Sequence, residues 1–267
     1  MTIPSKAIGI IDSGVGGLSI AKGICQLLPH ENLTYVADNH YAPYGDKSAS
    51  FIYQRMALIT QQLINQGCKA IVIACNTATV NAIDKLRQQF SIAFIGVEPA
   101  IKPACEHSIN KSVGILATQA TSKNDRFLNL VKTHQNGSQV YIQPCPGLVE
   151  LIEQGQLTSP ACQQLLQQFI EPLLAKNIDR LVLGCTHYPF LTQQILALTQ
   201  HKIEIIETAT PVANQLKKIL IEQKITAPKN QLAQHTFYCS ERTKNYQKLV
   251  NQLWASPIDL QQLMFNK

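Results

Sequence analysis

The chain has 267 residues, of which 45% are hydrophobic and 15% are charged, and its net charge is +6. We expect a cytoplasmic protein of one large or two modest domains, because no signal segment precedes the first strand and no apolar run is long enough to cross a membrane. No basic run or aromatic platform indicates nucleic-acid binding. The positive charge is typical of a solvated basic surface, or of a field that attracts small anions.

Strands alternate with helices in the first part of the chain. We expect strands at 6–11, 32–37, 70–74 and 92–97, and helices at 18–28, 51–66 and 77–90. A glycine-rich turn at 12–17 joins the first strand to the first helix, where bare amides favour anions. Its glycine spacing differs from that of a dinucleotide-binding loop. The loop at 38–45 is rich in polar and turn residues, which makes it a candidate lining for a cleft.

The second part of the chain repeats this alternation. We expect strands at 112–116, 139–142, 179–184, 202–206 and 236–239, with helices from Thr121, over 148–153, over 163–176, after Pro189, over 211–224 and over 241–254. Strands that alternate with helices form parallel sheets. The sequence therefore predicts an α/β protein.

Two of the apolar strands end in a cysteine followed by polar residues. One continues into Cys75-Asn76-Thr77 and the other into Cys185-Thr186-His187. The carboxyl end of a parallel strand is where open α/β sheets bind ligands. A single cysteine in such a place is more often a core residue, but two in matching places indicate a shared chemical role.

Three pairs of positions suggest that the chain contains two copies of one unit. Asp12 matches Ala117, Cys75 matches Cys185 and Glu98 matches Glu207, at offsets of 105, 110 and 109 residues. A chance alignment of two generic alternating patterns would give similar offsets. We expect two pseudo-symmetric doubly wound domains with parallel-sheet cores and the active site in the cleft between them. Residues 1–97 with 209–267 would form the domain of Asp12 and Cys75, and residues 98–208 the domain of Glu153 and Cys185.

Two thiols, one in each half, suit a reaction that treats both faces of one carbon alike. In a racemisation, one group removes a proton from one face and the other returns a proton to the opposite face. A free thiol has a pKa of about 8.5, which helix amino ends and polar neighbours lower. Each positioned acid or base contributes about 10²–10⁴-fold to the rate. The pair Cys75 and Cys185 therefore predicts a two-base racemase.

Six blocks of sequence, in order along most of the chain, resemble the glutamate racemases of the aspartate/glutamate racemase family. They are Asp12-Ser13-Gly14-x-Gly16-Gly17, Pro43-Tyr44-Gly45, Ala74-Cys75-Asn76-Thr77-Ala78-Thr79, Gly96-Val97-Glu98-Pro99-Ala100, Cys145-Pro146 with Glu153, and Leu183-Gly184-Cys185-Thr186-His187-Tyr188-Pro189. The two cysteine blocks together are highly specific.

The resemblance implies a cofactor-independent enzyme that needs no metal and supplies D-glutamate for peptidoglycan synthesis, and we expect a homodimer. By this likeness Cys75 acts on D-glutamate and Cys185 on L-glutamate, with Asp12 assisting Cys75, and His187 and Glu153 assisting Cys185. The implied substrate contacts are Asp12, Ser13, Tyr44, Gly45, Asn76, Thr77, Thr121, Thr186 and His187.

Several alternatives stay open at this point. The chain could be an aspartate racemase or another cysteine-dependent enzyme of the same family, or a non-catalytic module that binds a sugar or nucleotide. Asp12 is also a plausible helix cap, and Glu153 a routine partner of a helix start. Tyr44 and His187 could be packing or structural residues. We interpret the six cysteines other than Cys75 and Cys185 as structural.

Overall fold

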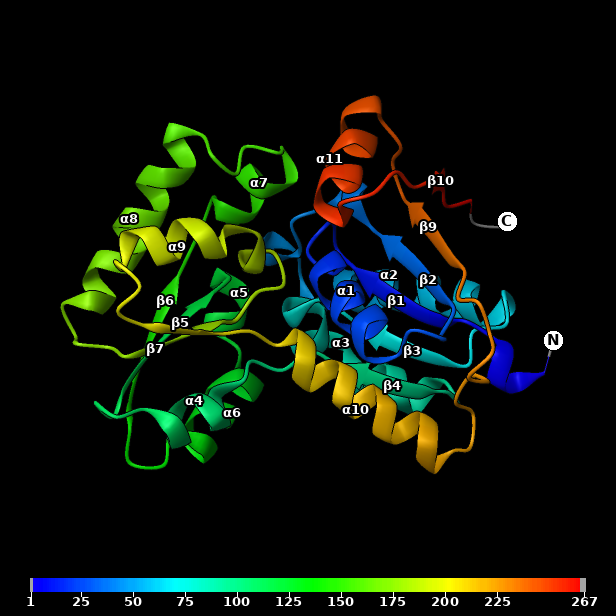
Figure 1. Cartoon of the computed structure of the whole chain (residues 1–267), viewed down its shortest axis with the longest axis horizontal. Helices are drawn as coiled ribbons and strands as arrows, with labels where there is room; N and C mark the ends of the chain where they lie inside the picture. Colours follow the sequence, from blue (N-terminus) through cyan, green and yellow to red (C-terminus); the bar gives the residue numbers. More distant parts are fainter. Residues whose placement is uncertain (1, 265–267) are drawn as a thin grey trace. The chain divides into compact units, whose positions relative to one another are not determined.

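A computed structural model describes residues 2–264 and divides them into two compact units (Figure 1). The first unit combines the chain up to Val97 with the chain from Ala209 onward, and the second is Glu98–Thr208. Each unit has its own parallel sheet, which confirms the predicted α/β class.

The first unit has a six-stranded parallel sheet in the order β10-β9-β2-β1-β3-β4. Its strands are β1 (Ile8–Asp12), β2 (Leu33–Ala37), β3 (Ala70–Ile73), β4 (Ala93–Gly96), β9 (His235–Cys239) and β10 (Leu260–Gln262). The strands β1, β2 and β3 are buried along their whole length. This follows from their continuous apolar sequences, because a strand of a doubly covered sheet is buried on both faces.

Five helices accompany this sheet within the described residues: α1 (Leu18–Leu27), α2 (Ala49–Asn65), α3 (Asn76–Gln89), α10 (Ala209–Glu222) and α11 (Lys244–Trp254). The helices α2 and α3 pack together over the face that carries Ile11, Ile71 and Ile73. Ser48 caps α2, and Gly67 follows its end at φ +85°, a conformation that glycine adopts without strain. The helix α1 packs against α10 and α11.

The second unit has a four-stranded parallel sheet in the order β6-β5-β7-β8. Its strands are β5 (Ser112–Ala117), β6 (Gln139–Pro144), β7 (Arg180–Leu183) and β8 (Glu204–Ile206). Its helices are α4 (Ile101–His107), α5 (Gln119–Ser122), α6 (Asp125–His134), α7 (Leu148–Glu153), α8 (Pro160–Leu174) and α9 (Thr192–Leu198). The helices α4 and α6 pack together, while α8 contacts α7 and α9.

The two sheets share one strand order. Strands β2-β1-β3-β4 of the first sheet correspond to β6-β5-β7-β8 of the second. The register agrees as well: Ile11 pairs with Ile73 in one unit, and Leu116 pairs with Leu183 in the other. Cys75 and Cys185 therefore follow equivalent strands at the same distance, two residues beyond these pairs.

Most predicted elements are confirmed, with ends that differ from the prediction by at most three residues. Among the α-helices and strands of residues 2–264, α4 and the short edge strand β10 went unpredicted. The predicted helix near Thr121 is two helices, α5 and α6, because Asn124 caps a new helix by accepting hydrogen bonds from the amides of Arg126 and Phe127. The chain after Pro189 begins as a 3-10 turn, Tyr188–Leu191, before α9.

Candidate functional site

Cys75 lies between the carboxyl end of β3 and the start of α3. It is the N-cap of α3, and its sulfur accepts a hydrogen bond from the amide of Ala78 at 3.4 Å. Its thiol also lies 3.8 Å from Ser13 Oγ, on the turn that follows β1. Cys75 as a whole residue is 6% exposed. A sulfur at the amino end of a fourteen-residue helix lies in the positive field of the helix dipole, which favours a thiolate.

Asp12 and Asn76 lie beside this cysteine. Asp12 ends β1 and is fully buried, and its Oδ1 accepts a hydrogen bond from the amide of Gly14 at 2.7 Å. Asn76 is 2% exposed, yet neither polar atom of its amide group has a hydrogen-bond partner among residues 2–264. A buried polar group without a partner costs about 1–3 kcal/mol. A bound polar molecule that pairs with the Asn76 amide would remove this cost.

The loop after β2 brings Tyr44 to the same end of the sheet. A 3-10 turn, Tyr44–Asp46, packs against α3, and Tyr44 and Cys75 belong to one buried core cluster. The Tyr44 hydroxyl donates a hydrogen bond to Asp38 Oδ2 at 2.6 Å. Burial and the Asp38 carboxylate raise the pKa of Tyr44 well above its usual value, so the phenol keeps its proton.

Cys185, His187 and Glu153 form a chain of polar contacts in the second unit. Cys185 Sγ lies 3.7 Å from His187 Nδ1, and His187 Nε2 lies 2.6 Å from Glu153 Oε1 at the end of α7. Cys185 and His187 are both buried. A thiol, an imidazole and a carboxylate in this order match the arrangement of a nucleophile or acid/base with its oriented partner.

The environment of His187 favours its charged form. Burial by itself would lower the pKa of His187, but the hydrogen bonds to Cys185 and Glu153 outweigh burial and raise the pKa well above its usual value. The imidazolium has two N–H donors, one toward each partner. His187 can therefore hold a proton next to the sulfur of Cys185.

Two threonines lie at the ends of neighbouring strands of the second sheet. Thr121 is fully buried on α5, after β5, and its hydroxyl lies 2.9 Å from that of Thr118. Thr186 follows Cys185 and is 1% exposed. Since β5 and β7 are adjacent and parallel, their carboxyl ends meet at one edge of the sheet. Both hydroxyls therefore belong to the side of the unit that carries Cys185.

The two units differ at the positions that flank the thiols. In the shared strand order, Asp12 at the end of β1 corresponds to Ala117 at the end of β5. The residue two places after the cysteine is Thr77 in the first unit and His187 in the second. An acidic group therefore accompanies Cys75 from a neighbouring strand, whereas a histidine accompanies Cys185 from the same turn.

The structure groups the predicted residues by unit. Asp12, Ser13, Tyr44, Gly45, Asn76 and Thr77 lie with Cys75 at the carboxyl edge of the first sheet, and Glu153, Thr121, Thr186 and His187 lie with Cys185 in the second unit. Sequence reasoning missed Asp38, which accepts a hydrogen bond from Tyr44, and Arg55, which donates to Asp38. Cys145, interpreted from the sequence as structural, lies close enough to Cys185 that burial and this neighbour raise the pKa of the Cys145 thiol.

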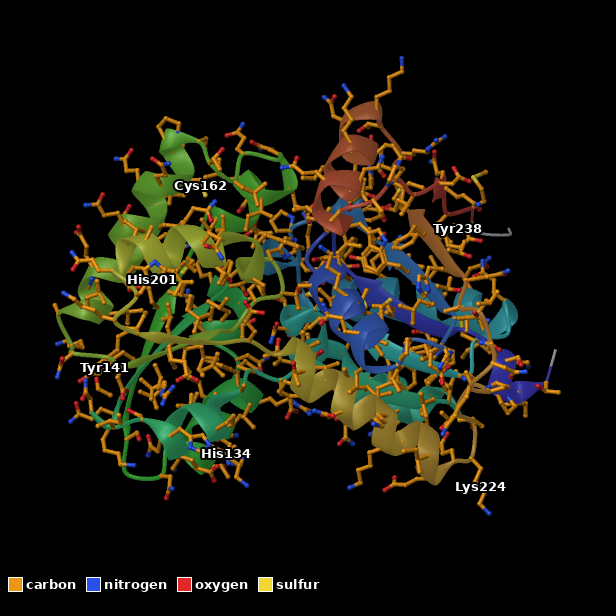
Figure 2. The ribbon with its side chains drawn as sticks, in the orientation of Figure 1. His134, Tyr141, Cys162, His201, Lys224 and Tyr238 are labelled. Carbon is orange, nitrogen blue, oxygen red and sulfur yellow. The ribbon has the colours of Figure 1, made fainter. Side chains whose placement is uncertain are left out.

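Other parts of the units lie apart from these residues. Cys162, labelled in Figure 2, is a fully buried residue of α8. Cavities of about 720 Å³ and 290 Å³ in the first unit share Lys6 and Gly67, near the amino ends of β1 and β3. Residues 2–264 contain no group of three or more His, Cys, Asp or Glu side chains that could hold a metal ion. Within the same residues no helix has both the length and the apolar character of a membrane span.

The sequence matches the Asp/Glu/Hydantoin racemase family over residues 19–216. A glutamate racemase of Ectopseudomonas mendocina (strain ymp) is 47% identical over 234 residues, which are 87% of this chain and 88% of the relative.

Solved structures of similar length have the same fold. A glutamate racemase from Bacillus anthracis aligns with a TM-score of 0.88 at 28% identity, over 97% of both chains. The Escherichia coli glutamate racemase, in complex with L-glutamate and the activator UDP-MurNAc-ala, aligns with a TM-score of 0.86 at 29% identity. That alignment covers 98% of this chain and 100% of the Escherichia coli chain.

Proposed function

This chain belongs to the Asp/Glu/Hydantoin racemase family, and from that premise we propose that it interconverts L- and D-glutamate by a cofactor-independent, two-base reaction. The observation that carries the mechanism is the equivalence of Cys75 and Cys185. Each follows the third strand of a sheet with the same order and register, and each has polar partners.

In the L-to-D direction, the Cys185 thiolate takes the α-proton of L-glutamate and becomes a thiol. The electron pair of the broken C–H bond stays on Cα and is delocalised into the carboxylate. The Cys75 thiol then gives its proton to the opposite face of Cα and becomes a thiolate. The D-to-L direction reverses these steps, so the reaction requires both sulfur atoms to reach one Cα from opposite sides.

The neighbouring groups have separate tasks in this scheme. His187, oriented by Glu153, assists proton transfer at Cys185, and Asp12 assists it at Cys75. Substrate binding falls to Ser13, the turn that contains Tyr44 and Gly45, Asn76, Thr77, Thr121 and Thr186. The unpaired amide of Asn76 supports this role, because it can donate to a carboxylate and accept from an ammonium group.

The direct test is incubation of the protein with L-glutamate in deuterated buffer, without pyridoxal phosphate or added metal. We expect the circular-dichroism signal of L-glutamate to decay to zero while deuterium enters at Cα. Aspartate serves as the competing substrate, and we expect its turnover to be far slower. Racemisation that depends on added pyridoxal phosphate, or absence of deuterium from the product, would refute the mechanism.

We also propose where the enzyme acts and which process uses its product. We place this activity in the cytoplasm, where D-glutamate serves peptidoglycan synthesis. None of the eight cysteines, which all lie within residues 2–264, forms a disulfide, and this is consistent with a reducing compartment. We further propose that the protein is a homodimer, which sedimentation analysis of the purified chain tests. A D-glutamate requirement in cells that lack the protein would support the cell-wall role.

A further inference from the structure

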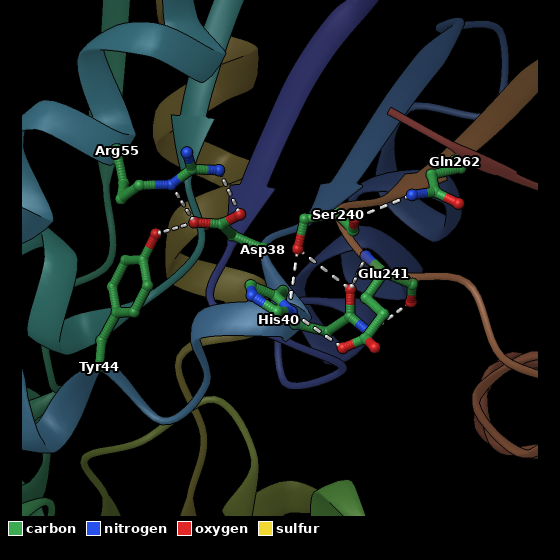
Figure 3. Close-up of polar contacts among 8 residues, drawn as sticks. Asp38, His40, Tyr44, Arg55, Ser240, Glu241 and Gln262 are labelled. Atoms are coloured by element: carbon green, nitrogen blue, oxygen red, sulfur yellow. Dashed lines mark hydrogen bonds and ion pairs between the residues drawn. The ribbon is translucent and has the colours of Figure 1, made fainter. Parts of the chain in front are cut away.

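The Asp38 carboxylate is a buried acceptor at the end of β2 that no step of the proposed reaction uses. Its Oδ2 accepts from the Tyr44 hydroxyl at 2.6 Å and from Arg55 Nε at 2.9 Å, and its Oδ1 accepts from Arg55 Nη2 at 2.7 Å (Figure 3). The Asp38 side chain has no exposed surface, and that of Arg55 is 13% exposed. We call Asp38, Arg55 and the Tyr44 hydroxyl the loop clamp.

The loop clamp limits the hydrogen bonds that Tyr44 can make to a ligand. Its phenolic proton is committed to Asp38, and the residue is 1% exposed, so the hydroxyl is not free to donate to a substrate carboxylate. The backbone of Tyr44 and Gly45 forms the 3-10 turn that packs against α3, whose N-cap is Cys75. The contribution of Tyr44 is therefore the position of this turn rather than a phenol contact.

Arg55 makes the buried carboxylate tolerable beside an acidic site. The Asp38 amide donates to the Asp12 carbonyl at 2.9 Å, so two acidic residues occupy adjacent strand ends. A buried carboxylate without a counter-ion is strongly destabilising. The planar guanidinium of Arg55 binds both carboxylate oxygens at once, a geometry that a lysine ammonium does not reproduce. It therefore both neutralises Asp38 and fixes its orientation toward Tyr44.

We propose that Asp38 and Arg55 are positioning residues of the racemase, which hold the turn at Tyr44 and Gly45 in place to receive substrate. The claim that the turn receives substrate rests on the proposed function. The claim that Asp38 and Arg55 hold the turn rests on the contacts of the loop clamp alone. A turn that is not held in place must be ordered when substrate binds, and the cost of this ordering weakens binding.

The same loop has a second attachment that provides a matched control. Asn39 and His40 contact the segment after β9. Asn39 Nδ2 donates to the Glu241 carbonyl at 2.7 Å. His40 Nδ1 lies 3.0 Å from Glu241 Oε2 (Figure 3). The side chains of His40 and Glu241 are both more than half exposed. An exposed pair contributes little to stability. Glu241→Gln thus disturbs the same loop without touching the clamp.

The experiment compares Asp38→Asn, Arg55→Lys and Tyr44→Phe with Glu241→Gln. Steady-state kinetics with each glutamate enantiomer should show KM about tenfold higher in the three clamp variants, with kcat within about threefold of the wild type. Glu241→Gln should stay within about twofold in both parameters. The rise in KM for Asp38→Asn combined with Tyr44→Phe should be smaller than the product of the two single rises, because both residues belong to one hydrogen-bonded network.

Hydrogen exchange gives a readout that does not depend on turnover. Amides of the segment 41–47 should exchange faster in Asp38→Asn than in the wild type, and at the wild-type rate in Glu241→Gln. Unchanged exchange together with unchanged KM in a folded Asp38→Asn would overturn the clamp. An equal rise of KM in Glu241→Gln would also overturn the proposal, because any loosening of the loop would then raise KM without involving the clamp. A wild-type protein inert toward glutamate would refute the proposed function, while exchange would still decide whether the clamp holds the loop.

Discussion

His187 Nε2 lies 2.6 Å from Glu153 Oε1, and the opposite ring nitrogen of His187 lies 3.7 Å from the sulfur of Cys185. Replacing Glu153 with Gln should lower kcat for glutamate by about 10²-fold, because an oriented acid/base partner contributes 10²–10⁴-fold. The effect should fall on kcat more than on KM, since Glu153 does not contact the substrate in this scheme. A variant with an unchanged kcat would contradict this role.

The same variant should change the pH dependence of activity. Glu153 helps to raise the pKa of His187, so its loss lets the imidazolium deprotonate at lower pH. The alkaline decline of kcat should therefore begin at lower pH in Glu153→Gln than in the wild type, in a profile measured from about pH 6 to pH 10. Coincident alkaline limbs would exclude His187 as the titrating group.

The raised pKa of His187 also links folding stability to pH. The unfolded-state pKa is about 6.5, so the stabilisation is complete below that pH and disappears as the pH rises through the higher folded-state value. The thermal midpoint of the wild type should exceed that of Glu153→Gln most at about pH 6, and the gap should narrow in alkaline buffer. A difference in thermal midpoint that grows with pH would show that folding does not raise the pKa of His187.

Cys75→Ala and Cys185→Ala should each abolish racemisation, and partial reactions should distinguish them. The two enantiomers are equal in free energy, so kcat/KM for L- and D-glutamate must agree in every active variant and cannot assign the faces. A glutamate analogue that eliminates a leaving group after proton removal can assign each cysteine to one face of Cα. We expect Cys75→Ala to retain elimination from the L-analogue alone, and Cys185→Ala from the D-analogue alone. Loss of both eliminations in either variant would argue against one base per face.

Glutamine should be a poor substrate. In the proposed site, threonine hydroxyls, backbone amides and Asn76 pair with the two carboxylates of glutamate. In glutamine one carboxylate is an amide, so a buried donor of the site would lack an acceptor or face the NH₂ group. We expect kcat/KM for glutamine to be lower than for glutamate by about 10²-fold or more, measured by polarimetry with deuterium incorporation as a second readout. Comparable values for the two substrates would exclude recognition of the second carboxylate.

Gly184 precedes Cys185 at a place where the backbone leaves no room for a side chain. A Cβ added there would lie 2.7 Å from the carbonyl oxygen of Leu116 on β5. Gly184→Ala should force β5 and β7 apart, lower the thermal midpoint by about 5 °C and displace Cys185, with a matching loss of activity. Gly114→Ala is the control, since the three atoms nearest to its added Cβ are the flexible side-chain ends of Ile178, Leu181 and Leu173 rather than backbone. Equal effects would show that backbone crowding at Gly184 is unimportant.

The strands were predictable because their own sequences decide them. Runs such as the one that forms β3 are apolar and β-branched, and turn or cap residues bound them on both sides. The helix α4 has only seven residues and contains Pro103, so its periodicity is too short to read. The strand β10 is three residues with two exposed glutamines, and its pairing with β9 rather than its composition defines it. Local sequence carries no information about that neighbour.

The residues of the candidate site also fall into those that local sequence predicts and those that only tertiary packing reveals. Cys75 and Cys185 were predictable because parallel topology fixes where strand ends lie, and the flanking polar residues follow directly in sequence. The role of Arg55 was not predictable, because Arg55 lies in the middle of α2, where a charged residue ordinarily belongs to a solvent-exposed face. Only tertiary packing shows that it turns inward to bind Asp38, 17 residues away.

The first sheet is completed from the far end of the chain. Its strands β1 to β4 are made early, but β9, which pairs with β2, spans His235–Cys239, and β10 comes later still. The second unit is one continuous segment that ends at Thr208. During synthesis, the unit of Cys185 can finish folding on the ribosome while the unit of Cys75 still exposes an open sheet edge at β2. Truncation near the C-terminus would thus leave a partly assembled sheet rather than a smaller working enzyme.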